Sequence, residues 1–195
     1  MSKKIIAVTG YSASGKSTVI NQIHKMYNCS VIRFGAIHKE CVKSSGHEYA
    51  KSWIKEEGTE PYDNRLVWYF KNYLISAINN NNDLIVIDGI FSHKCFRYLK
   101  HISSIDLINV SLDTEDSIRL KRIIKREGLS YTDAVKHLNT ADSIKKYVGL
   151  YDVIKDSDYC INGNKSEYEI RQEVSLILYG MECMKKSDKK EFEER

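Results

Sequence analysis

The most constraining feature of this 195-residue chain lies near its amino end, where an apolar run leads into a glycine-rich loop. Residues 3–9 have the β-branched, apolar character of a buried strand, and residues 10–18 read G-x-x-x-x-G-K-S-T. The pattern predicts a strand, a loop whose backbone N–H groups converge on phosphate oxygens, and a helix that begins beside them. A chain with this order of elements is expected to be an α/β protein that binds a nucleoside triphosphate.

Each position of this loop has a predicted task. Gly10 and Gly15 permit backbone turns that a Cβ atom would block. Lys16 is expected to reach the β and γ phosphates, and the Ser17 hydroxyl is expected to ligate Mg²⁺. The predicted nucleotide-binding residues are Gly10, Ser12, Ala13, Ser14, Gly15, Lys16, Ser17 and Thr18.

Four further short apolar runs are predicted strands, at residues 31–34, 84–88, 106–112 and 159–162. Helical patterns separate them, which predicts right-handed crossovers and a parallel sheet covered on both faces. The stretch between the second and third strands is too long for one crossover helix. We therefore expect a helix over about 37–57, interrupted near 44–46, and a second helix after Pro61. After the fourth strand, Thr114 or Asp113 should cap a helix that ends at Gly128, and Ser130 should start another.

The bulk composition indicates a soluble globular protein. The hydrophobic fraction is 42% and the charged fraction is 29%. No apolar run approaches the ~20 residues that cross a bilayer, and the amino end lacks a signal-peptide core. Five scattered cysteines without C-x-x-C indicate reduced thiols, and we expect a cytoplasmic protein. The net charge of +4 suits small anions without requiring nucleic acid or a membrane as partner.

Asp88 ends the most hydrophobic run of the chain and is followed by Gly89. A carboxylate at the carboxyl end of a buried strand beside the first strand is expected to be the outer Mg²⁺ ligand, together with Ser17. The alternative is an Asp-Gly turn without an ion. ATP-hydrolysing motors place Glu after this Asp, so Gly89 does not support attack by water. The absence of D-x-x-G and N-K-x-D segments argues against a GTPase.

Three arginines, Arg119, Arg122 and Arg126, recur at i, i+3 and i+7 and should share one helix face. In a phosphate-binding protein such a face is expected to stabilise the oxygens of the transferred phosphoryl group. A solvated surface face is the alternative. Residues 127–147 could then form a hinged cover that excludes water during transfer.

Taken together, these segments resemble the P-loop kinases of small metabolites, specifically the group of nucleoside monophosphate kinases and dephospho-CoA kinase. The resemblance spans about residues 4–178. Residues 31–40 (VIRFGAIHKE) are similar to the s-x-G-D-x-x-R-E segment of the nucleotide kinases, and residues 85–90 (IVIDGI) to their third strand. Residues 122–130 (RIIKREGLS) and 158–166 (DYCINGNKS) resemble the R-x-x-x-R-D-G-L-S and A-D-x-V-I-x-N-x-G-S segments of dephospho-CoA kinase.

The resemblance implies a three-layer P-loop fold with a five-stranded parallel sheet in one kinase domain over residues 1–180. It also implies a helical acceptor-binding insert at about 36–80 and a lid at about 119–150, with a charged, solvated tail at 185–195. ATP and Mg²⁺ are the implied cofactors. The backbone around Gly163 and Asn164 is implied to cradle the adenine.

On the acceptor side, the chain departs from both families. Ala36 and Lys39 stand where the nucleotide kinases carry Asp and Arg. His137 stands where dephospho-CoA kinase carries the Arg of its lid. The Asp-x-Asp segment of dephospho-CoA kinase is also absent from this chain. A hydroxyl acceptor must lose a proton, whereas a monophosphate needs only alignment and charge neutralisation. We therefore expect a nucleoside monophosphate as acceptor. Transfer to a metabolite hydroxyl, as in dephospho-CoA kinase, and a nucleotide-binding regulatory protein with little turnover stay open.

Cationic side chains in and near the insert are candidates to hold the acceptor phosphate, although each could instead form a surface ion pair. Three other residues could substitute for a catalytic base, namely His38, Glu40 and Asp63. The candidate acceptor-binding residues are Lys39, Arg65, Arg33 and Arg97.

Overall fold

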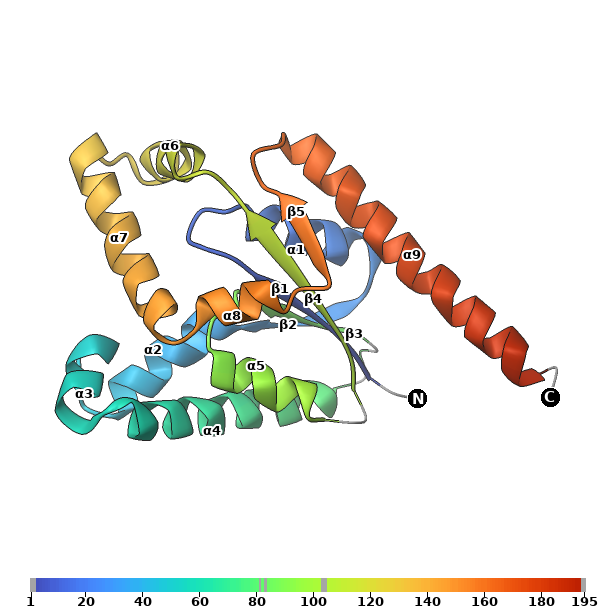
Figure 1. The fold of residues 1–195 in the computed structure, drawn as a ribbon, viewed down its shortest axis with the longest axis horizontal. Helices are drawn as coiled ribbons and strands as arrows, with labels where there is room; N and C mark the ends of the chain where they lie inside the picture. The colour runs from blue at the N-terminus through green and yellow to red at the C-terminus, as the bar shows by residue number, and fades with distance from the viewer. Residues whose placement is uncertain (1–2, 81, 83, 103–104, 194–195) are drawn as a thin grey trace.

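The predicted parallel sheet is confirmed. The computed structural model describes residues 3–80, 82, 84–102 and 105–193, with 181–193 described by backbone alone. In these residues five strands form one sheet in the order β2-β3-β1-β4-β5, and every neighbouring pair is parallel (Figure 1). The strands are β1 (Lys3–Thr9), β2 (Cys29–Arg33), β3 (Leu84–Asp88), β4 (Ile105–Asp113) and β5 (Tyr159–Asn162).

Alternation along the central strands supplies two cores, one on each face of the sheet. Ile5 and Ala7 of β1 face a core shared with α2, α3, α4, α5 and α8, whereas Ile6 and Val8 face one shared with α1 and α9. The register pairs Val8 with Asp88 of β3. Because parallel strands end at the same edge, the loop after β1 and the carboxylate that ends β3 lie side by side.

The region between β2 and β3 is the predicted helical insert. It contains α2 (Phe34–Ser44), α3 (Ala50–Glu57) and α4 (Thr59–Ile78), and the predicted interruption is present between the first two. Pro61 lies in the first turn of α4, where its missing N–H is not needed. Trp53, Tyr62 and Phe70 are fully buried, so the insert has a substantial core of its own.

Two short helices were not predicted from the sequence, α5 (His93–Lys100) and α8 (Leu150–Lys155). The side chain of Ser92 caps α5 by accepting a hydrogen bond from the Cys95 N–H at 3.3 Å. Gly149, with φ +92°, starts α8 in the left-handed region. The two helices span only 8 and 6 residues, which is shorter than the window in which helical periodicity identifies a helix.

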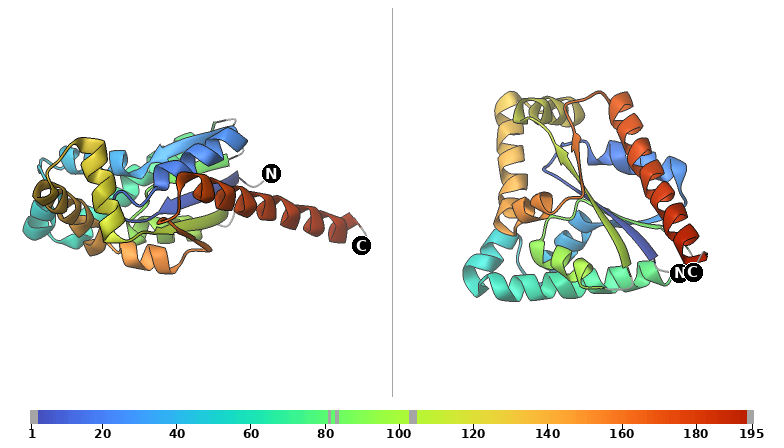
Figure 2. Two further views of the ribbon diagram at one scale, coloured as in Figure 1. Left: turned by 90° about the horizontal axis from the view of Figure 1, so that it is seen from above. Right: turned by 45° about the vertical axis from the view of Figure 1, so that its right-hand side comes forward.

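The segment predicted to form a lid contains α6 (Asp116–Glu127) and α7 (Tyr131–Tyr147), with Gly128 ending the first and Ser130 capping the second as expected. We call α6 and α7 the lid helices after this prediction, and their role as a lid stays a prediction. The expected cap of α6 by Thr114 or Asp113 is wrong, because Glu115 occupies the cap position. The Thr114 hydroxyl instead donates to the Ser14 carbonyl at 2.9 Å and ties this turn to the glycine-rich loop. Figures 1 and 2 show α7 running from α6 toward α2 and α3.

Helix α1 (Lys16–Met26) follows the glycine-rich loop and packs against α9 (Glu167–Glu193) through Ile170, Val174 and Leu178. The expected tail from Lys185 continues this helix as far as Glu193, and its side chains and residues 194–195 lie outside the described part of the chain. None of the described helices combines the length and the apolar character of a membrane span.

Candidate active site

The glycine-rich loop holds a backbone shape that requires its glycines. Gly10 has φ +143°, and a Cβ there would lie 2.8 Å from Ser14 Oγ and 3.0 Å from the Leu112 carbonyl oxygen. Gly15 has φ +104°, and Ala13 also lies in the left-handed region with φ +60°. Alternation of left-handed and right-handed residues forms the backbone concavities that bind anions.

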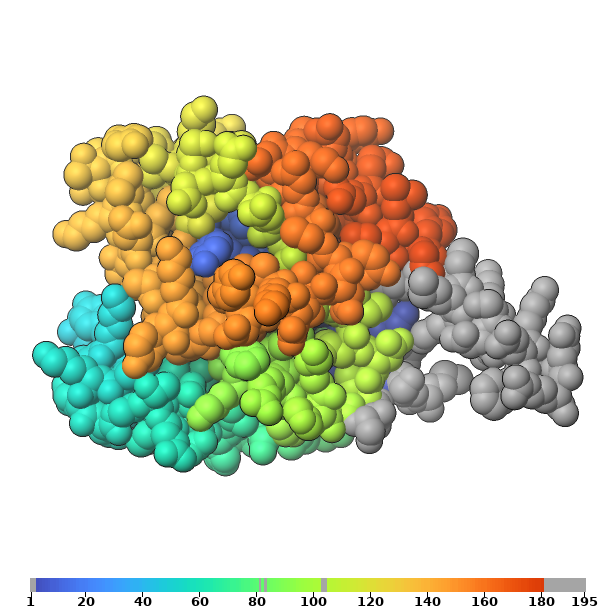
Figure 3. Space-filling view, in the orientation of Figure 1, coloured from blue at the N-terminus to red at the C-terminus, as the bar shows by residue number. Residues whose placement is uncertain are grey.

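A cavity of about 480 Å³ is lined by most of the residues that the sequence predicts for the donor site. We call it the phosphate cavity. In Figure 3 the blue amino-terminal segment is visible at the bottom of a hollow between the lid and the orange segment. Gly10, Arg119, Gly163 and Asn164 were predicted but do not line this cavity. The predicted residues that do line it are Ser12, Ala13, Ser14, Gly15, Lys16, Ser17, Thr18, Asp88, Arg122 and Arg126.

Lys16 is half-buried and lines this cavity. Its Nζ donates to the carbonyl oxygens of Gly10 at 3.0 Å and Tyr11 at 2.7 Å. Burial, with the nearby charge of Lys145, lowers the pKa of Lys16 to about 7. A polyphosphate beside this amine would favour its charged form.

Ser17 and Asp88 fit the predicted magnesium site. A hydroxyl and a carboxylate are the oxygen donors that Mg²⁺ prefers, and both line the same cavity. Among the described residues, no hydrogen bond or ion pair engages the Asp88 carboxylate. In that part of the chain no group of three or more His, Cys, Asp or Glu side chains is placed to hold a metal. An ion bound here would therefore rely on phosphate oxygens for its remaining ligands.

The three arginines of α6 are divided between two roles. Arg122 lines the cavity and donates to the carbonyl oxygens of Ala13 at 3.2 Å and Gly163 at 2.7 Å. Arg126 also lines it and is exposed. Arg119 instead turns toward α7, where it is buried in an ion pair with Asp142. The structure thus brings two of the three predicted arginines to the phosphate cavity.

Sequence reasoning missed two residues of α7, Asp142 and Lys145. Lys145 lines the phosphate cavity, and its Nζ donates to Ser12 Oγ at 2.6 Å. The Asp142 carboxylate accepts from the Ser12 backbone N–H at 3.0 Å and lies 3.6 Å from Lys145 Nζ. The only sequence signal was the pair Lys145-Lys146 within the predicted cover.

The segment at Gly163 and Asn164 packs behind the glycine-rich loop. A Cβ at Gly163 would lie 1.9 Å from Thr114 Oγ1 and 2.7 Å from the Ser14 carbonyl oxygen, so only glycine fits. The Asn164 side chain accepts from the Glu115 N–H at 2.9 Å. The backbone of residues 163–164 therefore lies near the phosphate cavity. The predicted contact of this backbone with adenine stays a prediction.

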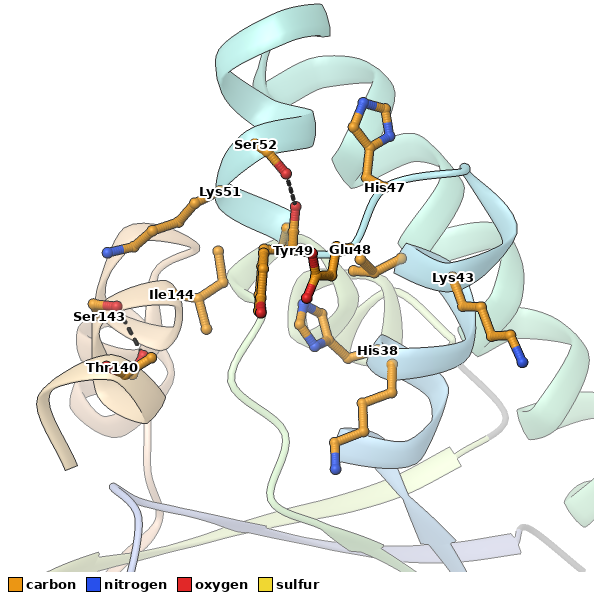
Figure 4. A pocket seen from close by; sticks show the side chains of 13 residues that line it. His38, Lys43, His47, Glu48, Tyr49, Lys51, Ser52, Thr140, Ser143 and Ile144 are labelled. Atoms are coloured by element: carbon orange, nitrogen blue, oxygen red, sulfur yellow. Dashed lines mark hydrogen bonds between the residues drawn. The ribbon is translucent and has the colours of Figure 1, made fainter. Parts of the chain in front are cut away.

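A second cavity, of about 850 Å³, lies between the insert and the lid. Its lining comes from α2, from α3 with the turn before it, and from α7 (Figure 4). The residues that matter most below are His38, Lys39, Val42, Tyr49, Ala50 and Ile144. We call this space the acceptor cavity because it adjoins the lid helix that also carries Lys145.

The four cations predicted for the acceptor are dispersed. Lys39 lines the acceptor cavity. Arg65 is exposed on α4 and donates to the Ser44 carbonyl at 3.1 Å, Arg97 is exposed on α5, and Arg33 ends β2 in register with Asp88. These three line neither cavity.

The candidate bases are dispersed in the same way. His38 lines the acceptor cavity. Glu40 accepts a hydrogen bond from the Tyr73 hydroxyl at 2.5 Å, and the buried Asp63 pairs with Lys94 at 3.3 Å. Neither of these carboxylates lines the cavity.

Comparison with known proteins agrees with this geometry. A family model described as "AAA domain" matches residues 6–136. A cytidylate kinase from Thermoplasma volcanium is 27% identical over 177 residues, which cover 89% of this chain and 88% of that protein. Shikimate kinase from Aquifex aeolicus has a TM-score of 0.52 at 19% identity, covering 92% of this chain and 98% of its own. Dephospho-CoA kinase from Campylobacter jejuni has a TM-score of 0.51 at 16% identity, covering 93% and 98%. The predicted fold class and the predicted resemblance to P-loop small-molecule kinases are confirmed.

Proposed function

This chain belongs to the AAA domain family and has the fold of P-loop small-molecule kinases, and on that basis we propose that it transfers the γ-phosphoryl group of ATP to a nucleoside monophosphate. One observation carries the proposal. A single cavity gathers the glycine-rich loop, four cationic side chains and two oxygen donors, and the lid helix α7 connects it to the acceptor cavity. The cations are Lys16, Lys145, Arg122 and Arg126.

On the donor side, the loop amides and Lys16 would hold the β and γ phosphates of ATP. When bound, Mg²⁺ would be held by Ser17 and Asp88 and would offset negative charge on these phosphates. Arg122 donates hydrogen bonds to the carbonyl oxygens of Ala13 and Gly163. It therefore links the glycine-rich loop to the segment at residues 163–164.

During transfer, an oxygen of the acceptor phosphate attacks the γ-phosphorus while the bond to the β–γ bridging oxygen breaks and ADP leaves. Lys145 and Arg126 are placed to neutralise charge on the equatorial oxygens of the moving group. Since α7 borders both cavities, its position also controls the access of water to the reacting phosphates.

The acceptor side favours a monophosphate over a hydroxyl. A phosphate is already ionised near neutral pH, so its attack needs no base. The candidate carboxylate bases Glu40 and Asp63 are engaged outside the acceptor cavity, whereas His38, Lys39 and Glu48 line it. Because burial lowers the pKa of His38 to about 4, its imidazole is a weak base, and Lys39 suits a phosphate. The similarity to a cytidylate kinase makes CMP the first acceptor to test.

The test is a turnover assay with ATP and Mg²⁺ across CMP, UMP, AMP, GMP, dephospho-CoA and shikimate. We expect ADP formation with a nucleoside monophosphate, and the corresponding diphosphate as product by phosphorus NMR. Lys16→Ala should abolish turnover, which shows that the activity belongs to this cavity. Product only on a hydroxyl compound would replace the proposed acceptor. ATP binding without any product would favour a regulatory nucleotide-binding protein.

A further inference from the structure

Tyr49 is an exposed aromatic side chain that lines a cavity. The residue is 63% exposed, and it lines the acceptor cavity between the insert and the lid. Tyr131 of the lid helix is similarly exposed, at 68%, but lines neither the phosphate cavity nor the acceptor cavity. An accessible aromatic face inside a cavity is a surface on which a planar ligand can stack.

The backbone that carries this ring is fixed at the start of α3. Tyr49 is the N-cap residue of α3, and its carbonyl accepts hydrogen bonds from the Trp53 N–H at 3.2 Å and from Ser52 Oγ at 2.7 Å (Figure 4). A side-chain hydrogen bond with the neighbouring Glu48 raises the pKa of the exposed Tyr49 phenol. The backbone that carries the ring is therefore ordered before any ligand arrives, so less ordering is needed on binding.

The walls beside Tyr49 suit a flat, uncharged ring. Figure 4 shows Tyr49 edge-on, with Ile144 of α7 on one side and His38 of α2 on the other. All three line the same cavity. Burial and the charges of Lys39 and Lys145 lower the pKa of His38 to about 4, so its imidazole is neutral near pH 7. Ile144 and His38 thus offer an apolar and an uncharged aromatic face, while the charged side chains of Lys43, Glu48 and Lys51 also line the cavity.

Two cations that could hold the charged end of such a ligand lie apart from the side chains beside Tyr49. Lys39 lines the cavity on the same helix as His38, one residue further along. Lys145 lines the adjoining phosphate cavity from α7, the helix that also supplies Ile144. An acceptor with a planar ring at one end and a phosphate at the other matches this separation of apolar walls from cations.

We propose that Tyr49 determines acceptor specificity by stacking on the base of the acceptor, which restricts the substrate class to phosphorylated compounds that carry a planar aromatic ring. This inference rests on the proposed function, because it assigns the contact that selects the acceptor. It excludes sugar phosphates and alicyclic hydroxy acids as efficient substrates, since neither offers a π face to the ring.

The experiment compares wild type with Tyr49→Ala, Tyr49→Phe and the control Tyr131→Ala, using CMP, UMP, AMP, GMP and ribose 5-phosphate as acceptors. Tyr49→Ala should raise the KM for the accepted monophosphates about 10-fold to 100-fold and leave the KM for ATP within about 2-fold. Tyr49→Phe should stay near wild type, because it keeps the ring and loses only the bond to Glu48. Tyr131→Ala should match wild type, and ribose 5-phosphate should be a poor acceptor for all four proteins.

Calorimetric binding of the same compounds in the presence of ADP separates this inference from the proposed function. Turnover of a monophosphate that Tyr49→Ala leaves unchanged would overturn the stacking role and keep the kinase assignment. Binding without turnover, weakened by Tyr49→Ala and not by Tyr49→Phe, would overturn the kinase assignment and support stacking. Equal binding of ribose 5-phosphate and the nucleotides, or no binding of any of them, would overturn the inference. Circular dichroism and thermal unfolding of each variant confirm that the fold is retained.

Discussion

Lys145 brings a positive charge to the phosphate cavity from a helix remote in sequence from the glycine-rich loop. Its Nζ bonds Ser12 Oγ at 2.6 Å, so it lies against the loop that should hold the γ-phosphate. Removing a donor that stabilises charge developing in a transition state typically lowers kcat by about 10²-fold to 10³-fold. We expect Lys145→Ala to lower kcat within this range while the KM for ATP changes much less, as steady-state kinetics would measure.

Lys121→Ala is the matched control for this prediction, because it removes the same charge from an exposed position of the lid helix α6. Lys145→Arg should retain part of the rate, since it restores a cation at the same place. A Lys145→Ala enzyme with wild-type kcat and a raised KM for ATP would make this residue a binding group only.

Gly163 is packed so closely against its neighbours that adding a single methyl group should destabilise the fold. A Cβ there would meet Thr114 Oγ1 at 1.9 Å and the Ser14 carbonyl oxygen at 2.7 Å, and the second of these is backbone of the glycine-rich loop. Gly163→Ala should therefore lower the free energy of unfolding by about 1–3 kcal/mol and weaken ATP binding. Urea unfolding and calorimetry would measure the two effects.

Gly180→Ala provides the comparison, because it lies within α9 and its Cβ would meet none of the described atoms within 4 Å. That change should leave stability unchanged or raise it by up to about 1 kcal/mol, since alanine favours the helix. Equal stability of the two alanine variants would contradict the close packing at Gly163.

At the scale of residues, a site residue could be predicted from the sequence only where it belongs to a local motif. Lys16 and Ser17 were recognisable because the whole phosphate loop is one local motif, and Asp88 because it ends a buried strand. Asp142 and Lys145 carry no comparable local pattern. Their role depends on the tertiary placement of α7 against Ser12, which spacing along the chain does not encode.

At the scale of elements, the lid helices α6 and α7 are joined by a buried ion pair. The Arg119 guanidinium pairs with Asp142, and both residues are buried. Arg119 also lies 5.1 Å from the centre of the Tyr11 ring, so the pair joins both helices to the glycine-rich loop. Removing one partner leaves the other with a second ion-pair partner, Asp116 at 3.3 Å for Arg119 and Lys145 at 3.6 Å for Asp142. The loss should therefore lie below the cost of about 3–5 kcal/mol that is typical of a buried charge left without any partner.

We therefore expect Asp142→Ala and Arg119→Ala each to lower the free energy of unfolding by up to about 3 kcal/mol. The double variant should cost clearly less than the sum of the two, because neither charge is then left alone. A double-mutant cycle measured by urea unfolding provides the coupling energy. Additive losses would mean that the two side chains stabilise the lid independently.

The elements themselves were predicted where their signals were long or flanked by caps. The five strands and the two-part insert were recognisable from apolar runs and from the distance between strands. The start of α6 was misplaced because Thr114, a good capping residue, uses its hydroxyl for the Ser14 carbonyl instead. A local cap rule could not foresee a partner so distant in sequence.

At the scale of the whole molecule, the strand order explains why one cavity can combine these residues. With β1 between β3 and β4, the loop after β1 lies beside Asp88 on one side and beside the Thr114 turn on the other. The sequence predicted a parallel sheet, but it could not place the lid against the insert. The acceptor cavity exists only because α7 passes α2 and α3, so its lining was the part least accessible to prediction.

The stability of the whole molecule should depend on pH through His38. Its ring packs edge-on against Phe91 at 5.3 Å and Tyr62 at 6.0 Å, and Nε2 is buried without a hydrogen-bond partner among the described residues. Burial and the nearby charges of Lys39 and Lys145 lower the pKa of His38 to about 4 from 6.5. Between these two values the unfolded chain binds a proton that the folded chain does not. The free energy of unfolding should therefore fall as pH decreases from 6.5 to 4, by at most about 1.4 kcal/mol per pH unit from this group.

His38→Phe isolates this contribution, because it keeps a ring against Phe91 and Tyr62 and removes the titrating nitrogen. Urea unfolding of both proteins between pH 7 and 4.5 should give curves that diverge, with wild type losing more stability toward low pH. The depressed pKa of Lys16 acts in a different window, from pH 7 upward, and is common to both proteins. Parallel curves would show that the imidazole titrates alike in the folded and unfolded chains, and hence that the acceptor cavity is better hydrated than its apolar walls imply.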